Sequence, residues 1–144
     1  MQGAKKFLLG VVVAISAAAA VAPAHAQDNN RMSVNVPFEF VLNKSTLRSG
    51  QYKVEELSNG VVAFSDASGY LRRFAVTTPG GQVTNNHNGD PFLVFTRYGN
   101  VAFLSKVVFS DDNSYDLPKS NREKELIANL GSGQEVAMVI QPTR

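Results

Sequence analysis

The sequence predicts a mainly β fold, a small antiparallel β-sandwich or a partly open β-barrel of about seven strands with one short helix in the C-terminal half. Large apolar side chains recur at every second residue from Met32 to Leu42, which is the period of a half-buried strand. Turn-forming pairs such as Asn59-Gly60 follow at short intervals. A single later segment, which begins after Ser120, has the signals of a helix.

The first 26 residues predict a secretory signal peptide. Lys5 and Lys6 form a basic start, an apolar run extends from Phe7 to about Val21, and a small-residue motif ends at Ala26, after which we expect cleavage. The mature protein would then be exported to the periplasm or the cell exterior. Its contact with a membrane would be limited to the transient signal peptide.

Charge and cysteine content narrow the possible functions. The chain has 14 basic and 12 acidic residues, and loss of Lys5 and Lys6 with the signal peptide leaves twelve of each. A near-neutral mature protein gives no global electrostatic reason to expect a nucleic-acid partner. Without cysteine, the chain has no disulfides and no thiolate chemistry. Residues 27–144 have the length of one domain, and we expect a single β-rich domain there.

The first strand is predicted over Met32–Leu42. Pro37 lies within it and has no N–H to donate, so the strand should lie at a sheet edge or contain a bulge. A polar loop over Asn43–Gly50 then leads into a second strand, Gln51–Leu57. A bulge at Glu55-Glu56 would return Leu57 to the core face.

The middle of the chain predicts further short strands and one long loop. After the turn at residues 58–60 come strands over Val61–Ser65 and Tyr70–Thr77, and then an irregular surface loop over Thr78–Pro91. A hairpin follows, in which Phe92–Tyr98 and Val101–Phe109 are joined by a two-residue turn. Both of its faces are apolar, so both must be covered.

The predicted helix is the expected cover for one of those faces. Ser120 and Glu123 have the spacing of a capping box, and Gly131 ends the helix. The expected buried side consists of Leu126, Ile127 and Leu130, and the expected solvent side consists of Arg122, Glu123, Lys124 and Glu125. A last strand is predicted over Glu135–Gln141.

No catalytic constellation is apparent. His87 is the one histidine of the mature chain and lies among asparagines in the long loop, where no third group would hold a catalytic base in place. Glu55 and Glu56 should point to opposite faces of their strand, and Glu39 should face solvent. Arg72-Arg73 beside aromatic residues could suggest a nucleic-acid strip, but the neutral charge of the mature chain argues against it.

Calcium is the one metal that the sequence brings into question, and only weakly. Asp112 and Asp116 supply carboxylates at alternate positions, and Asp90 ends a similar polar run. Neither run has the glycine and the terminal acid of a calcium loop, which favours ordinary turns. We therefore expect no metal and no cofactor.

A set of structural motifs carries a resemblance. The motifs are Val36-Pro37-Phe38-x-Phe40, Leu47-x-x-Gly50-x-Tyr52-x-Val54, Phe95-x-Arg97-Tyr98-Gly99, Phe103-Leu104 and Leu117-Pro118-Lys119-Ser120. The chain resembles, over most of its mature length, a family of small secreted proteins of Gram-negative soil bacteria with no assigned activity. Arg48-Ser49 departs from the Pro-Ala expected before Gly50. The resemblance implies export and a compact β-rich domain, and supplies no site residues.

The sequence therefore favours an exported, non-enzymatic β-domain that acts by binding or as a structural part of the envelope, through exposed sheet edges that could pair with a partner. Its partner would be a protein or an envelope polymer. Two alternatives stay open. One is a carbohydrate-active or other hydrolase that uses the loop carboxylates Asp90, Asp111, Asp112 and Asp116. The other is a self-assembling surface protein.

Overall fold

The computed structural model describes residues 30–83 and 89–139, which form a mainly β fold with one short helix. The predicted signal peptide and His87 lie outside these residues. The elements are β1 (Arg31–Val36), β2 (Phe40–Leu42), β3 (Ser45–Leu47), β4 (Gly50–Glu56), β5 (Val61–Asp66), β6 (Arg72–Val76), β7 (Thr78–Pro79), β8 (Phe92–Tyr98), β9 (Val101–Ser110), β10 (Asn113–Asp116), α1 (Asn121–Leu130) and β11 (Gln134–Val139).

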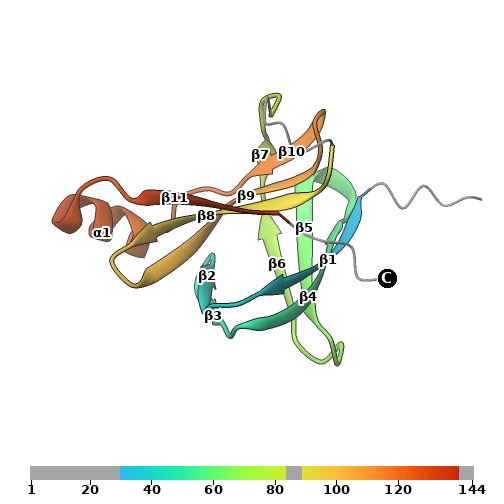
Figure 1. The fold of residues 1–144 in the computed structure, drawn as a ribbon, viewed down its shortest axis with the longest axis horizontal. Coiled ribbons are helices and arrows are strands. Elements are labelled where there is room, and N and C mark those ends of the chain that lie inside the picture. The colour runs from blue at the N-terminus through green and yellow to red at the C-terminus, as the bar shows by residue number, and fades with distance from the viewer. Residues whose placement is uncertain (1–29, 84–88, 140–144) are drawn as a thin grey trace, which may run out of the picture.

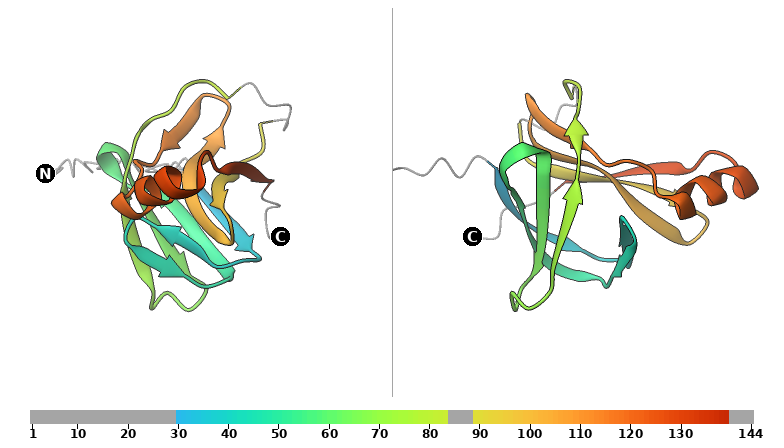
Figure 2. Two further views of the ribbon diagram at one scale, coloured as in Figure 1. Left: turned by 90° about the vertical axis from the view of Figure 1, so that its left-hand side faces the viewer. Right: turned by 180° about the vertical axis from the view of Figure 1, so that it is seen from behind.

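The strands form two sheets, which confirms the predicted small sandwich or partly open barrel (Figures 1 and 2). The first sheet has the antiparallel order β1-β4-β5-β6. The second has the order β11-β8-β9-β10-β7, with β2 added in parallel to β9 and β3 paired with β2. The sequence pattern predicted β2 only as the end of the strand Met32–Leu42. Three short strands contradict the prediction, because β3 and β7 lie in segments predicted as loops and β10 lies in a segment predicted as a turn.

The predicted strand Met32–Leu42 is divided between the two sheets. β1 ends at Val36, residues 37–39 are not in a strand, and β2 begins at Phe40. Pro37 explains the break because it cannot donate to a strand ladder. β1 lies at the border of the first sheet, as its proline predicted. The chain therefore passes from one sheet to the other within a few residues.

The main core lies between the two sheets and is centred on Phe40, which is 1% exposed. Its ring centroid lies 5.4 Å from that of Phe95 and 5.5 Å from that of Tyr52, in edge-to-face contacts. Phe64 approaches from β5. The apolar even positions of the first predicted strand are buried here except Phe38, which is half-buried against the same cluster, so the alternation identified the core face correctly.

Both faces of the β8–β9 hairpin are covered, as predicted, but α1 covers only part of the outer face. Leu126 and Ile127 of α1 pack on Tyr98 and Phe103. Further along the same hairpin, Phe92, Val94 and Val108 form a separate cluster with Val83. The register between β8 and β9 shifts at Val94 and Phe95. The residues of β9 that face the main core therefore change from even to odd positions at this point.

Two predictions about α1 are wrong. Glu123, expected on the solvent side, is 4% exposed because its carboxylate accepts a hydrogen bond from Tyr98. Leu130, expected on the buried side, is 62% exposed because the helix ends there, beyond the hairpin that it covers. Half of the capping box is present, since the Glu123 N–H donates to Ser120 Oγ at 3.2 Å.

The predicted bulge at Glu55-Glu56 is also wrong. Both residues pair in regular register, with Ala63 and Val62 of β5 respectively. The phase of the strand is not restored because Leu57 leaves the sheet and enters a 3₁₀ turn over Ser58–Gly60, which replaces the expected hairpin turn. Glu55 and Glu56 therefore lie on opposite faces, as predicted from the strand period.

Candidate functional site

A groove of about 580 Å³ lies where the β2–β3 turn, β6 and the start of α1 meet. Figure 1 shows the helix projecting from the body of the protein, with β2 and β3 lower in the view and below the β8–β9 hairpin, and Figure 2 shows β6 from the opposite side. The residues that line the groove come from three parts of the chain that are distant in sequence: residues 41–45, 73–74 and 118–122.

Among the described residues, four cationic side chains line this groove and no carboxylate does. They are Lys44, Arg73, Lys119 and Arg122. Lys119 Nζ lies 3.8 Å from Glu123 Oε1, whereas the other three have no ion-pair partner among the described residues. These positive charges repel one another, and an anion placed between them would relieve that repulsion. We call this set of four residues and its groove the cationic groove.

The β2–β3 turn is held against β6 by one side chain. Asn43 adopts a left-handed backbone conformation, with φ of 55°, which asparagine tolerates better than most residues and which suits a two-residue turn. Its Nδ2 donates to the Phe74 carbonyl oxygen at 3.2 Å. This bond fixes the spacing between Lys44 on the turn and Arg73 on β6.

The start of α1 is fixed by a buried hydrogen bond to β8. Tyr98 Oη donates to Glu123 Oε1 at 3.0 Å, and both residues are about 4% exposed. Burial, and then the neighbouring Glu123 carboxylate, raises the pKa of Tyr98 to about 12. Since Glu123 lies in the first turn, this contact also fixes Lys119 and Arg122, which lie in or beside that turn.

The glutamates considered as catalytic candidates lie apart. Glu39 is exposed at the crossing between the sheets. Glu55 forms ion pairs with Arg31 at 3.2 Å and with Arg72 at 2.9 Å on the outer face of the first sheet. Glu56 points the other way and accepts a short hydrogen bond from Tyr115 Oη, while its Oε2 is buried without a hydrogen-bond partner.

The three aspartates considered as calcium ligands have different partners or none of the same kind. Asp116 pairs with Lys106 at 3.3 Å, Asp112 Oδ1 accepts from Gln82 Nε2 at 3.4 Å, and Asp90 is exposed. Within residues 30–83 and 89–139, no three His, Asp or Glu side chains are grouped so as to hold a metal ion. The same part of the chain contains no helix long and apolar enough to cross a membrane.

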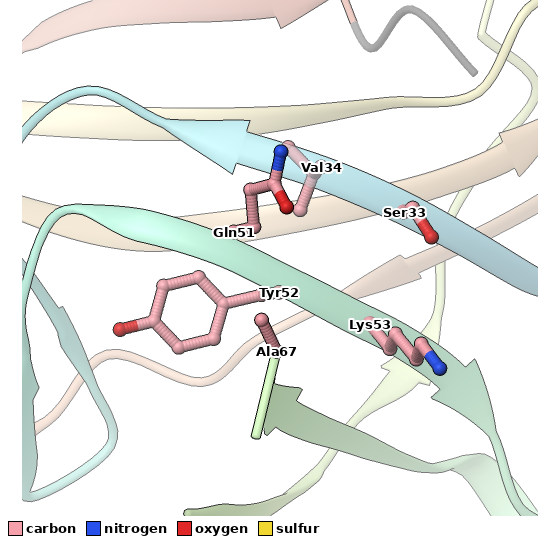
Figure 3. Close-up of a pocket in the computed structure, with 6 residues that line it drawn as sticks. All are labelled: Ser33, Val34, Gln51, Tyr52, Lys53 and Ala67. Carbon is pink, nitrogen blue, oxygen red and sulfur yellow. The ribbon is translucent and has the colours of Figure 1, made fainter. Parts of the chain in front are cut away.

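A second depression, of about 250 Å³, lies on β1 and β4 (Figure 3). Ser33, Gln51 and Lys53 are among its lining residues, and Lys53 is the one charged side chain among those that the structure describes there. A lone lysine offers little basis for recognising a ligand. The cationic groove is therefore the better candidate site.

Comparisons with known proteins give no assignment. No protein-family model matches the chain, and no curated protein or solved structure is significantly similar to it. The resemblance to a secreted bacterial family stays a prediction.

Sequence reasoning did not identify the cationic groove. Arg73 and Arg122 were noticed only as part of a doubtful nucleic-acid strip and of the solvent side of a helix. The net charge of the mature chain concealed them, because twelve acidic residues elsewhere balance the total. A local excess of cations becomes visible only after the fold has brought three distant segments together.

Proposed function

We propose that the protein is an exported, non-enzymatic binding module that takes an anionic partner into the cationic groove. The observation that carries this proposal is the gathering of four cations around one concave site that no carboxylate lines within residues 30–83 and 89–139. Three of them lack an ion-pair partner among the described residues, so an anion bound by these three would not have to displace an existing ion pair.

The groove also contains apolar surface. Val41 and Leu42 lie in its wall, and the Phe74 side chain, which is 53% exposed, lies at its rim. A partner that combines negative charge with apolar groups would use both features, since charge sets orientation and association rate while apolar contact contributes affinity. Export would place such a module among the proteins and polymers of the cell envelope.

The proposal is tested by measuring binding of the purified protein to polyglutamate and polygalacturonate as anionic probes, with dextran as a neutral one. We expect binding of at least one anionic probe that weakens as salt is raised. Charge reversal at Arg73→Glu with Arg122→Glu should weaken it about tenfold or more. The control, Lys53→Glu with Lys124→Glu, makes the same change in net charge at exposed residues outside the groove and should have little effect.

Equal loss in both double variants would mean that only net charge matters, and would contradict a specific site. Turnover of ester, glycoside or peptide substrates provides a second check. If the protein hydrolysed any of them, and alanine at His87 or Glu39 abolished the reaction, the non-enzymatic assignment would be wrong.

A further inference from the structure

β6 has an unpaired backbone edge that faces the cationic groove. β6 pairs only with β5 among the described residues. Two backbone bonds at its ends, from Thr77 N to Gly60 O and from Asp66 N to Leu71 O, fix which residues of β6 exchange hydrogen bonds with β5. Because these alternate along an antiparallel ladder, Arg72, Phe74 and Val76 direct their N–H and C=O groups away from β5.

Two carbonyl groups of that edge already accept hydrogen bonds, whereas its outward N–H groups are free to donate in the described structure. The Arg72 carbonyl accepts from Arg73 Nη1 at 3.2 Å, and the Phe74 carbonyl accepts from Asn43 Nδ2. The N–H groups of Arg72, Phe74 and Val76 have no hydrogen-bond partner within the described part of the chain. Phe74 and Val76 are also exposed, at 53% and 69%. This edge can therefore donate to an incoming backbone.

Two cavities lie beside this edge and beside the turn that leads into it. The cationic groove lies between residues 41–45 and residues 73–74. Another cavity, of about 470 Å³ and distinct from the depression on β1 and β4, lies between residues 46–52 and residues 66–71. Both cavities therefore lie along one seam between the β2–β3–β4 segment and the chain that leads into β6. Asn43 is the one side chain whose hydrogen bond crosses from the hairpin to β6 in the described structure.

The charges at the seam select the kind of strand that would fit. Arg73 and Lys44 lie on either side of the groove, whereas Arg72 on the edge strand itself is already paired with Glu55. Among the described residues, the cavity at the other end of the seam is lined by one cation and one carboxylate, Arg48 and Asp66. A second copy of β6 would bring two arginines against these cations, which is unfavourable. A strand that carries carboxylates would instead complement them.

We propose that the anionic partner is an extended acidic polypeptide segment that adds to the free edge of β6 as a new strand. This inference rests on the proposed function, whose site it shares. Backbone N–H groups of β6 would donate to carbonyls of the segment, its carboxylates would contact the cationic groove, and its apolar side chains would cover Phe74 and Val76.

The probe is a labelled octapeptide of alternating valine and aspartate, and its binding to the purified protein is followed by fluorescence anisotropy. Two peptides serve as controls. In one, lysine replaces aspartate, which reverses the charge. In the other, proline replaces valine, which keeps the charge but prevents strand pairing. We expect only the valine–aspartate peptide to bind strongly.

The protein variants separate backbone pairing from side-chain contact. Phe74→Ala removes the ring and keeps the N–H, whereas Phe74→Pro removes both. The N–H of Phe74 makes no bond to β5, so proline is compatible with the sheet. We expect Phe74→Pro to bind the peptide about fivefold more weakly than Phe74→Ala does. Val76→Pro repeats the test at the next outward N–H, and Asn35→Pro on β1, the opposite border of this sheet, should bind normally.

Amide hydrogen exchange supplies a direct reading. On peptide binding, exchange at Phe74 and Val76 should slow, while exchange at Asn35 should not change. Equal binding of the valine–aspartate and proline–aspartate peptides, which carry the same charge, would overturn this inference. Unchanged amide exchange at β6 would also overturn it.

The polymer results distinguish the two proposals. If polygalacturonate bound and the peptide did not, the anion-binding function would stand and the peptide inference would fall. If no anionic probe bound, both would fall. A concentration-dependent dimer that Phe74→Pro abolished would assign this edge to a second copy of the chain and would also overturn the inference.

Discussion

Tyr98 Oη and Glu123 Oε1 form a buried hydrogen bond of 3.0 Å that joins the end of β8 to the first turn of α1. The bond offsets part of the desolvation free energy of the buried carboxylate, because a charged acceptor without a donor is far less stable away from water. It also fixes the wall of the cationic groove that carries Lys119 and Arg122.

Tyr98→Phe should lower the free energy of unfolding by about 1–3 kcal/mol, because the Glu123 carboxylate would stay buried without its donor. Urea unfolding followed by circular dichroism would measure the change. Tyr70→Phe is the matched control, since Tyr70 is 95% exposed, and should have almost no effect. A Tyr98→Phe variant as stable as the control would show that the bond contributes nothing.

Stability at high pH should depend on Tyr98. Its pKa is raised from 10.0 to about 12 by burial and by Glu123, so the folded state favours the neutral phenol. The contribution is therefore fully present below pH 10 and is lost as the pH rises toward 12. Unfolding midpoints measured between pH 8 and pH 12 should fall in the native protein and fall less in Tyr98→Phe. Parallel pH profiles for the two proteins would contradict this.

Tyr115 and Glu56 offer a test of how a partly buried acid is tolerated. Tyr115→Phe should destabilise the protein by about 1–3 kcal/mol, because the carboxylate already has one oxygen without a partner and would lose its remaining donor. Adding Glu56→Leu should recover part of that loss, since removing both polar groups leaves no buried charge. Chemical unfolding of both variants would show this, and a double variant weaker than the single one would refute it.

Phe40→Ala should destabilise the protein by about 3–5 kcal/mol, because it opens a cavity where the two sheets meet. Phe74→Ala removes the same ring at a half-exposed site and should change stability by about 0.5 kcal/mol or less. Thermal unfolding of the pair separates core packing from surface contact. Comparable losses in both variants would place Phe40 outside the core.

Gly133→Ala should also destabilise the protein. A Cβ atom at Gly133 would lie 2.5 Å from Tyr98 Cε1 and 2.7 Å from Thr96 Cγ2, which is too close for van der Waals contact. Overpacking of this kind costs about 1–3 kcal/mol. Gly81→Ala, where an added Cβ meets no described residue within 4 Å, is the control. Chemical unfolding would decide, and an unchanged Gly133→Ala would mean that the Tyr98 ring can move aside.

The sequence predicted the fold better than the site. Alternation identified the residues that pack around Phe40, and glycine pairs located several turns, because both signals are local. Pro37 indicated an edge or a bulge, but the passage of the chain into a second sheet at this point was missed because it depends on the pairing of β2 with β3 and β9. The burial of Glu123 was missed because it depends on Tyr98 in a distant part of the chain. The groove was missed for the same reason: Lys44, Arg73 and Arg122 are neighbours only in the folded protein.

The crossing of the chain between the two sheets has a consequence for how the protein unfolds. Only residues 37–39 separate β1 in the first sheet from β2 in the second, and only Thr77 separates β6 from β7. Neither sheet can therefore unfold without displacing strands of the other. We therefore expect one all-or-none unfolding transition, with circular dichroism and tyrosine fluorescence giving the same midpoint. Short crossings of this kind supply the cooperativity that a cysteine-free domain does not obtain from disulfides.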